Sequence, residues 1–314
     1  MSKMKALLVD VEKTGLDRIY LGDVERPVVR KGEVLVQVKA VPLSSWEEDI
    51  ALNDNQEALA EEINKHNVNL GLEFSGIVES DGARFRKGDR VIGSIHFLQD
   101  EKTLSEYISV HEDYLALLPA SLSFAEGAAL PVSTETAYIG FIQLAGVSRN
   151  KEVLIIGANG GIGVYAIQFA KAHGAVITAI GGKDSLDKLK ALGADEAYDY
   201  REVAASDLSR KFDILFDLSR TMKFEDAQQL LHKDGIFVNA NPQLVELTPE
   251  TATENNPYLF VAHGKSENLE EILRYVDARQ IVPVVEAVYP IQQFKLAFKQ
   301  LLEGTRLGKI IIEF

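Results

Sequence analysis

The chain opens with short apolar runs separated by turn-forming residues. Residues 33–39, EVLVQVK, alternate imperfectly between apolar and polar positions, as a half-buried strand does. Turn signals such as Lys31 with Gly32, and Asp81 with Gly82, bound these runs. We expect strands over residues 5–10, 33–40, 74–79, 89–93 and 105–110, so the first third of the chain should be rich in β-structure. The polar, acidic stretch 46–67 is expected to be a helix or loop at the surface.

The pattern changes near residue 121, where strand-like and helix-like segments begin to alternate. Residues 151–156 form a continuous apolar run, which is typical of a parallel strand covered on both faces. Further strands are expected over 175–180, 212–217, 235–241, 284–288 and 309–314. Helices are expected within 123–146 and over 161–173, 186–192, 223–232, 269–279 and 291–303. This alternation predicts βαβ units and a doubly wound parallel sheet.

A glycine-rich loop follows the first strand of this alternating region. Residues 157–163 read GANGGIG and lead directly into an apolar helical pattern. Glycines in this position allow a tight turn and the close approach of a diphosphate, and the helix N-terminus then offers free N–H groups to the phosphates. The strand before the loop and the strand after the helix supply the context that such a motif requires. The loop therefore predicts a dinucleotide site.

The end of the next strand distinguishes the two nicotinamide cofactors. Enzymes that select NAD usually place an acidic residue there for the ribose 2′-hydroxyl. Here the corresponding position is Ile180 or Gly181, and Lys183 follows closely. A lysine could meet the 2′-phosphate of NADPH, which is therefore favoured. The alternatives are that Asp184 takes the NAD role or that Lys183 is simply solvated.

Composition and charge exclude several other classes of protein. The 314 residues are 46% hydrophobic and 25% charged, as in an ordinary globular protein with a core. The formal charge of −14 argues against non-specific nucleic-acid binding, which relies on lysine and arginine. The absence of cysteine excludes disulfides and thiolate zinc sites. No apolar run is long enough for a membrane span or a signal peptide, so a cytoplasmic protein is expected.

With these motifs in place, the chain resembles the medium-chain dehydrogenase/reductase superfamily, and most of all its zinc-free, quinone oxidoreductase-like branch. The similarity rests on residues 71–78, 85–91, 128–138 and 157–163, and on the ending GKIII at 308–312. It implies an α/β fold with a GroES-like β-barrel substrate domain and a Rossmann domain with a doubly wound parallel sheet. The barrel would comprise residues 1–122, completed by 284–314, and the dinucleotide-binding domain residues 123–283. The active site would lie between them.

The resemblance also implies how the cofactor is held. The phosphates would meet the backbone of the glycine loop, while Lys183 and Tyr200 would lie on the 2′-phosphate and adenine side. Thr136 would approach the nicotinamide, and Lys309 would approach from the closing segment. The complete set of expected cofactor-binding residues is Thr136, Asn159, Gly160, Gly161, Ile162, Gly163, Gly182, Lys183, Tyr200, Ser219, Asn239, Asn241 and Lys309.

Zinc-dependent relatives bind their catalytic zinc through two cysteines and a histidine. The matching positions here are Ser44 or Ser45, Leu72 and about Val132, whose side chains are poor zinc ligands. The histidines show no metal-ligand spacing; they are His66, His96, His111, His173, His232 and His263. No metal is therefore expected.

Without zinc, reduction of an isolated carbonyl group is difficult, and a conjugated acceptor is the more suitable substrate. The chain is predicted to be an NADPH-dependent enzyme that transfers hydride to a quinone or an α,β-unsaturated carbonyl. The expected catalytic residues are Ser45, Trp46 and Thr136, with Ser44 beside them. Glu73 could act as an acid or base, but a structural role is the simpler interpretation. No general acid is identified.

Two other functions are compatible with the same glycine loop. One is an enoyl-thioester reductase, although no clear basic patch for the thioester's phosphates is present. The other is a weakly catalytic NADPH-binding protein that acts as a sensor or interaction module. A homodimer is expected from the resemblance, with residues 235–239 and 257–262 as candidates for its sheet edge.

Overall fold

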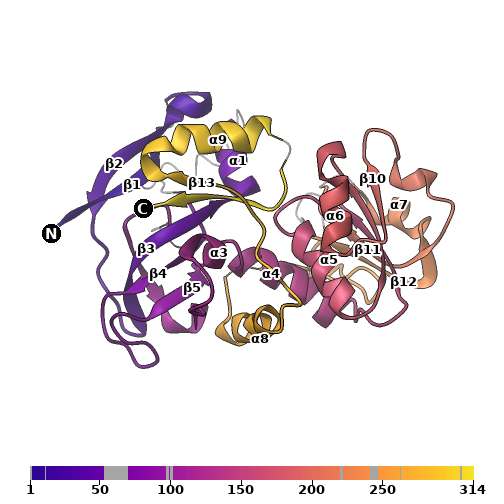
Figure 1. Ribbon diagram of the computed structural model, residues 1–314, viewed down its shortest axis with the longest axis horizontal. Helices are drawn as coiled ribbons and strands as arrows, with labels where there is room; N and C mark the ends of the chain where they lie inside the picture. Colours follow the sequence, from indigo (N-terminus) through magenta and orange to yellow (C-terminus); the bar gives the residue numbers. More distant parts are fainter. Residues whose placement is uncertain are drawn as a thin grey trace.

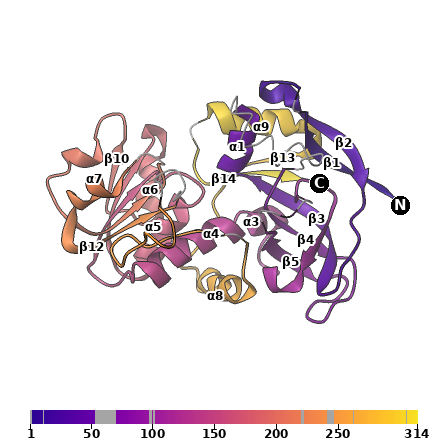
Figure 2. The same ribbon diagram turned by 180° about the vertical axis from the view of Figure 1, so that it is seen from behind.

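The computed structural model describes residues 2–10, 12–52, 70–96, 99, 102–219, 222–240, 247–261, 263–304 and 306–314. Two sheets lie side by side along the long axis, and helices α4 (Pro131–Tyr138) and α8 (Ser266–Asp277) lie between them (Figure 1). Both ends of the chain belong to the same half of the molecule, as the reverse view also shows (Figure 2).

The sheet in that half joins early strands to the last two strands of the chain. Its order is β13-β14-β3-β4-β5-β7, and β6 also pairs with β3. Strands β13 and β14 run parallel, whereas the other pairs are antiparallel. A separate antiparallel pair is formed by β1 and β2. The strands are β1 (Lys3–Val9), β2 (Ile19–Glu25), β3 (Glu33–Leu43), β4 (Glu73–Val78), β5 (Arg90–Ser94), β6 (Tyr107–His111), β7 (Leu115–Leu117), β13 (Val285–Pro290) and β14 (Lys309–Glu313).

The second sheet is entirely parallel and has the order β10-β9-β8-β11-β12. Its strands are β8 (Glu152–Ile156), β9 (Val176–Gly181), β10 (Glu196–Asp199), β11 (Phe212–Asp217) and β12 (Leu231–Asn239). Strand β8 is central and buried, as its continuous apolar sequence predicts. The chain leaves β8 toward β9 on one side and later returns to β11 on the other. Such a reversal of strand order creates a crevice at the carboxyl ends of the strands.

Helices cover both sheets, and local sequence signals explain where several of them begin. Ser123 and Glu126 form a capping box at the start of α3, and Pro131 occupies the first turn of α4. The remaining helices are α1 (Ser45–Leu52), α3 (Phe124–Ala128), α5 (Gly163–Ala172), α6 (Leu186–Leu192), α7 (Phe224–Gln228) and α9 (Phe294–Glu303). Short 3₁₀ segments are Gly15–Arg18, Glu112–Tyr114, Lys183–Ser185, Ala205–Asp207 and Ile291–Gln293, and Ile139–Leu144 is a π-helix.

The predicted fold class is confirmed, because a parallel Rossmann-type sheet stands beside a separate, mainly antiparallel sheet. The helix predicted over residues 223–232 is too long, since Leu231 pairs with Phe212 and starts β12. The expected strand 235–241 correspondingly begins earlier than predicted. Of the polar, acidic stretch 46–67, only residues 46–52, in α1, lie within the described residues. No helix in the described part of the chain is both long and apolar enough to cross a lipid bilayer. The domain boundaries stay a prediction.

Candidate active site

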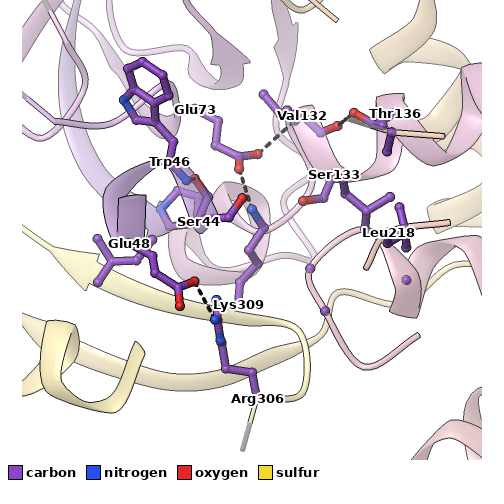
Figure 3. Close-up of a pocket in the computed structure, with 18 of the residues that line it drawn as sticks. Ser44, Trp46, Glu48, Glu73, Val132, Ser133, Thr136, Leu218, Arg306 and Lys309 are labelled. Carbon is purple, nitrogen blue, oxygen red and sulfur yellow. Dashed lines mark hydrogen bonds and ion pairs between the residues drawn. The ribbon is translucent and has the colours of Figure 1, made fainter. Parts of the chain in front are cut away.

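A cavity of about 650 Å³ lies between the glycine loop and the barrel-side helix α1. Strands β4 and β14, helix α4 and the segment before β14 also contribute to its wall (Figure 3). The cavity therefore lies at the carboxyl end of β8, where the reversal of strand order predicts a ligand site. Its polar and charged lining residues are Ser44, Ser45, Trp46, Glu47, Glu48, Asp49, Glu73, Ser133, Thr136, Asn159, Arg306 and Lys309.

The glycine loop has the geometry of a cradle for a diphosphate. Gly157 has φ = +79°, in the left-handed region that glycine adopts readily. A Cβ atom at Gly163 would lie 2.5 Å from the carbonyl oxygen of Ala158, so only glycine fits there. A Cβ added at Gly160 would meet only the carbonyl oxygen of Gly157, at 3.3 Å, so this side of the loop is less crowded than Gly163. Together with the start of α5, these residues fit the diphosphate of a dinucleotide.

Asn159 ties the glycine loop to two neighbouring segments. Its side-chain amide donates a hydrogen bond to the carbonyl oxygen of Arg306 at 2.8 Å, and its Oδ1 accepts one from the N–H of Gly182 at 3.1 Å. Its own carbonyl oxygen accepts a bond from the N–H of Gly308 at 3.1 Å. Asn159 thus holds the loop, the end of β9 and the segment before β14 in a fixed relation.

A second cavity of about 530 Å³ lies beyond the loop, at the carboxyl ends of β8, β9 and β11. Tyr200 and Ser219, both expected at the cofactor, line it. The hydroxyl of Ser219 donates to buried Asp217 at 2.5 Å. Burial raises the pKa of Asp217. The apolar walls and the exposed Tyr200 ring suit an adenine base, since pockets of this kind combine apolar surface with a few polar groups.

Two cations stand beside this second cavity. Lys183 is exposed, and its Nζ lies 3.4 Å from Oε1 of Glu202. The guanidinium of Arg201 stacks on the Tyr200 ring, 4.5 Å from its centroid. The sequence prediction named Lys183 but not Arg201. An aromatic residue followed directly by a cation, Tyr200 and Arg201, would have been the available signal.

Other predicted cofactor residues are placed differently. Asn239 is fully buried, and its amide reaches Asp217 at 3.4 Å rather than a cavity wall. Gly182 contributes its N–H to Asn159, as described above. Asn241 lies outside the described residues. Thr136 and Lys309 both line the larger cavity with the loop.

Lys309 and Glu73 form a buried ion pair inside the larger cavity. The Nζ of Lys309 lies 2.7 Å from Oε1 of Glu73, and both side chains are almost fully buried (Figure 3). The second oxygen of Glu73 accepts the backbone N–H of Val132 at 2.8 Å. The stem of Lys309 lies over the glycine loop, because a Cβ at Gly161 would be 2.8 Å from its Cε. This pair links β4, β14 and α4 at one point.

The predicted catalytic residues occupy the wall formed by α1 and α4. Ser45 is an exposed residue at the start of α1, and it lines the cavity. The indole of Trp46 points away from the Glu73–Lys309 pair and packs against the barrel core (Figure 3). The hydroxyl of Thr136 donates within its own helix to the carbonyl oxygen of Val132 at 2.7 Å.

An ion pair that the sequence did not indicate closes the lower side of the cavity. Arg306 donates to Oε2 of Glu48 at 2.5 Å and so joins the segment before β14 to α1 (Figure 3). The two residues are 258 positions apart. A contact between such distant residues has no local sequence signal.

Comparison with known proteins finds similarity to dehydrogenases and reductases in both sequence and structure. A family model described as zinc-binding dehydrogenase matches residues 192–312. The chain is 35% identical over 254 residues to the 2-methylene-furan-3-one reductase of Solanum lycopersicum, a match covering 77% of this chain but only 62% of that protein. It is 27% identical to the chloroplastic quinone-oxidoreductase homolog of Spinacia oleracea, over 95% of both chains. The structure of the quinone oxidoreductase from Coxiella burnetii matches all of both chains with a TM-score of 0.86 and 25% identity.

The predicted resemblance to the medium-chain dehydrogenase/reductase superfamily is confirmed by these matches. The predicted similarity to quinone oxidoreductases is confirmed by these relatives. The description of the family model raises the question of zinc at this site. The positions expected to match zinc ligands, Ser44 or Ser45, Leu72 and Val132, lie outside the residues that the model matches.

These positions do not fit a zinc ion. Leu72 has no donor atom, and the N–H of Val132 is bonded to Glu73. Glu73 is itself committed to Lys309. Within the described ranges, no three His, Cys, Asp or Glu side chains gather as a metal site. Within the described residues, the polar lining of the cavity instead includes hydrogen-bonded side chains and two ion pairs, Lys309 with Glu73 and Arg306 with Glu48.

Proposed function

We propose that the protein is an NADPH-dependent oxidoreductase that reduces quinones or α,β-unsaturated carbonyl compounds without zinc. The observation that carries the proposal is the larger cavity. It joins a glycine cradle for the cofactor to a wall of hydroxyl groups and a buried lysine, with no set of metal ligands among the described residues. The relatives support the substrate class, because one is named for a methylene group conjugated to a ketone and another for quinones.

The cofactor, when bound, supplies a hydride to the substrate. The glycine loop would hold its diphosphate, the second cavity its adenine, and Thr136 and Lys309 would border its nicotinamide end. NADPH is favoured over NADH because two cations, Lys183 and Arg201, lie close to the second cavity and could meet a 2′-phosphate, and because no acidic residue ends β9.

The remaining task of the chain is to stabilise the negative charge that develops on the substrate oxygen. Preorganised hydrogen-bond donors in a cavity that excludes water are effective at this. Hydroxyl groups of Ser44, Ser45 and Ser133 and the ammonium group of Lys309 line the cavity. A conjugated acceptor needs only such donors and a proton, whereas an isolated carbonyl would need stronger polarisation.

The test is substrate-dependent oxidation of the cofactor by the purified protein. NADPH and NADH are each offered with a panel of quinones, α,β-unsaturated ketones and enoyl thioesters. We expect turnover with quinones or enones and a preference for NADPH. Turnover of enoyl thioesters alone would replace the proposed substrate class, and binding of NADPH without turnover of any acceptor would refute the enzyme. The homodimer and the cytoplasmic location stay predictions from the sequence.

A further inference from the structure

A serine and a buried glutamate are hydrogen-bonded at the wall of the larger cavity. Ser44 immediately precedes α1, and its hydroxyl lies 2.6 Å from Oε2 of Glu47. The same carboxyl oxygen accepts the N–H of Ser44 at 2.7 Å, and Oε1 accepts the N–H of Gly71 at 3.1 Å. Glu47 is only 1% exposed, yet both residues line the cavity. The pair thus connects the cavity to a carboxyl group that bulk water hardly touches.

Burial favours the neutral form of Glu47 and raises the pKa of this carboxyl, although its hydrogen bonds oppose the shift. The hydrogen bonds to Glu47 come from Ser44 and from the backbone, and Lys309, whose positive charge opposes the shift, is itself bonded to Glu73. A buried carboxyl without a directly bonded cation retains its proton to higher pH than an exposed one.

The protonation state of Glu47 decides what Ser44 offers to the cavity. The Ser44 hydroxyl oxygen already accepts the N–H of Trp46 at 3.2 Å. When Glu47 is ionised, the Ser44 proton is directed to Glu47. When Glu47 is neutral, its own O–H can donate to Ser44, and the Ser44 proton is then free to point into the cavity. Figure 3 shows Ser44 on the α1 side of the cavity, across from Thr136.

We propose that Ser44 is the residue that protonates the reduced substrate and that Glu47 is the buried acid that replaces its proton; this inference rests on the proposed function. After hydride has reduced the conjugated acceptor, the substrate carries the negative charge as an enolate or hydroquinone anion. The O–H bond of Ser44 breaks as a new bond to hydrogen forms on the substrate. In the same step the O–H bond of Glu47 breaks as Ser44 receives its proton, so no serine alkoxide forms, and the Glu47 carboxylate takes one proton from solvent before the next cycle.

The charged groups around α1 are the alternatives to Glu47 for donating a proton to Ser44, and most of them are paired elsewhere. Glu48 is paired with Arg306, and Glu73 with Lys309. On the packed elements, Asp17 is paired with Lys295, and Lys299 with Glu303. The remaining charged groups on α1 and on the elements packed against it are Asp49, Arg18, Glu33 and Lys39. Glu47 is the carboxyl that bonds the cavity hydroxyl.

The first test removes the Ser44 hydroxyl. Ser44→Ala should lower kcat for an enone about a hundredfold, the usual size of a general-acid contribution, with little change in KM. The dissociation constant for NADPH should stay the same. Ser109→Ala is the matched control, because Ser109 bonds Glu33 at 2.7 Å in the same sheet but does not line the cavity. It should leave kcat unchanged.

The second test follows Glu47 without cofactor or substrate. At neutral pH, the infrared difference spectrum of the wild type minus Glu47→Gln, both without ligands, should contain a carboxylic-acid C=O band that the difference spectrum of the wild type minus Glu33→Gln lacks. With an enone, kcat of the wild type should fall as the pH rises through the pKa of Glu47. This decline should be missing in Glu47→Gln, whose kcat is low throughout. Thermal unfolding of each variant shows whether it is folded.

The outcomes separate the relay from the proposed function. If the wild type reduces enones or quinones but Ser44→Ala keeps its kcat within about threefold, the relay is wrong and the reductase stands. If Ser44→Ala changes KM alone, Ser44 binds substrate and donates no proton. A missing infrared difference would show that Glu47 is ionised and would overturn its role. If the wild type reduces no acceptor, both proposals fall together.

Discussion

Lys309 Nζ lies 2.7 Å from Glu73 Oε1, and the two side chains are 5% and 4% exposed. The residues are 236 positions apart, so the bond joins the last strand of the chain to β4. The other oxygen of Glu73, Oε2, accepts the backbone N–H of Val132 at the start of α4. The pair therefore fixes three elements that together form one wall of the cavity.

Removing one partner of this ion pair should lower the free energy of unfolding more than removing both. Lys309→Met leaves a buried carboxylate without its counter-ion and should lower the free energy of unfolding by about 3 kcal/mol. The double variant Glu73→Gln with Lys309→Met removes both charges and should recover at least half of that loss. Urea unfolding of the protein without cofactor measures both. The single variant Glu73→Gln completes the comparison. If the losses of the two single variants simply add up in the double variant, the two charges do not interact.

Two substitutions in the glycine loop should affect different properties, one mainly the stability of the fold and the other mainly the affinity for NADPH. Gly163→Ala places a Cβ 2.5 Å from the Ala158 carbonyl oxygen and should destabilise the fold by about 1–3 kcal/mol. In Gly160→Ala the new Cβ meets only the Gly157 carbonyl oxygen, at 3.3 Å, which is tight but less severe, so this variant should be destabilised less than Gly163→Ala. Its methyl group fills the cradle, however, and should weaken NADPH binding at least about tenfold, equivalent to about 1.4 kcal/mol.

Fluorescence titration of NADPH and thermal unfolding distinguish the two effects. Gly146→Ala, at a glycine with nothing within 4 Å but φ = +58°, is the control for backbone strain away from the loop. It should lower stability without changing the affinity for NADPH. Normal NADPH binding by Gly160→Ala would mean that the diphosphate lies elsewhere.

Sequence patterns predicted the parts of the fold that depend on neighbouring residues. The strand 151–156, the glycine loop and the following helix were found because hydrophobic periodicity and glycine conformation are local properties. The end of the helix at residue 232 was wrong because pairing of Leu231 with Phe212 overrides the local helical pattern. A single chain cannot reveal which strand it will meet.

The candidate site was predictable to the same extent. Loop residues and Lys309 came from motifs, and both line the cavity. The bond between Arg306 and Glu48 joins distant parts of the chain and was not foreseen. The partner of Ser44, by contrast, is only three residues away. It was missed because the sequence does not show that Glu47 is turned inward and buried.

The cations beside Tyr200 make the cofactor preference testable. Lys183→Glu should raise the dissociation constant of NADPH about tenfold, equivalent to about 1.4 kcal/mol, and change that of NADH much less. Glu202→Gln should improve NADPH binding slightly, because it frees Lys183 from its exposed partner. Arg201→Ala tests the second cation in the same titration. Equal effects of Lys183→Glu on both cofactors would contradict a 2′-phosphate at this place.

Turnover should not depend on a divalent metal. Incubation with EDTA followed by gel filtration should leave kcat with a quinone or enone unchanged, because serine, leucine and valine at the positions expected to match zinc ligands are poor ligands for zinc. Added zinc should not raise kcat. Metal analysis of the treated protein is the control, since it establishes that the chelator has removed any bound ion. Loss of turnover on chelation and its return with zinc would refute the zinc-free mechanism.

Glu135, in α4 behind the cavity, should make stability depend on pH. Burial raises its pKa from 4.5 to about 7, although Oε1 accepts bonds from Asn268 at 2.8 Å and from the N–H of Lys265 at 3.1 Å. Its Oε2 has no partner within the described part of the chain. The folded protein therefore holds this proton more tightly than the unfolded chain does. The contribution of Glu135 to the free energy of unfolding is fully present below pH 4.5. It is lost as the pH rises to about 7, by up to about 3 kcal/mol.

Glu135→Gln should remove that pH dependence, because the amide has no proton to lose. Relative to the wild type, the variant should gain stability as the pH rises from 5 to 8, which urea unfolding at several pH values measures. Glu225→Gln, at an exposed carboxyl of α7, is the control and should show no such trend. A constant difference between Glu135→Gln and the wild type over this pH range would mean that folding does not raise the pKa of Glu135.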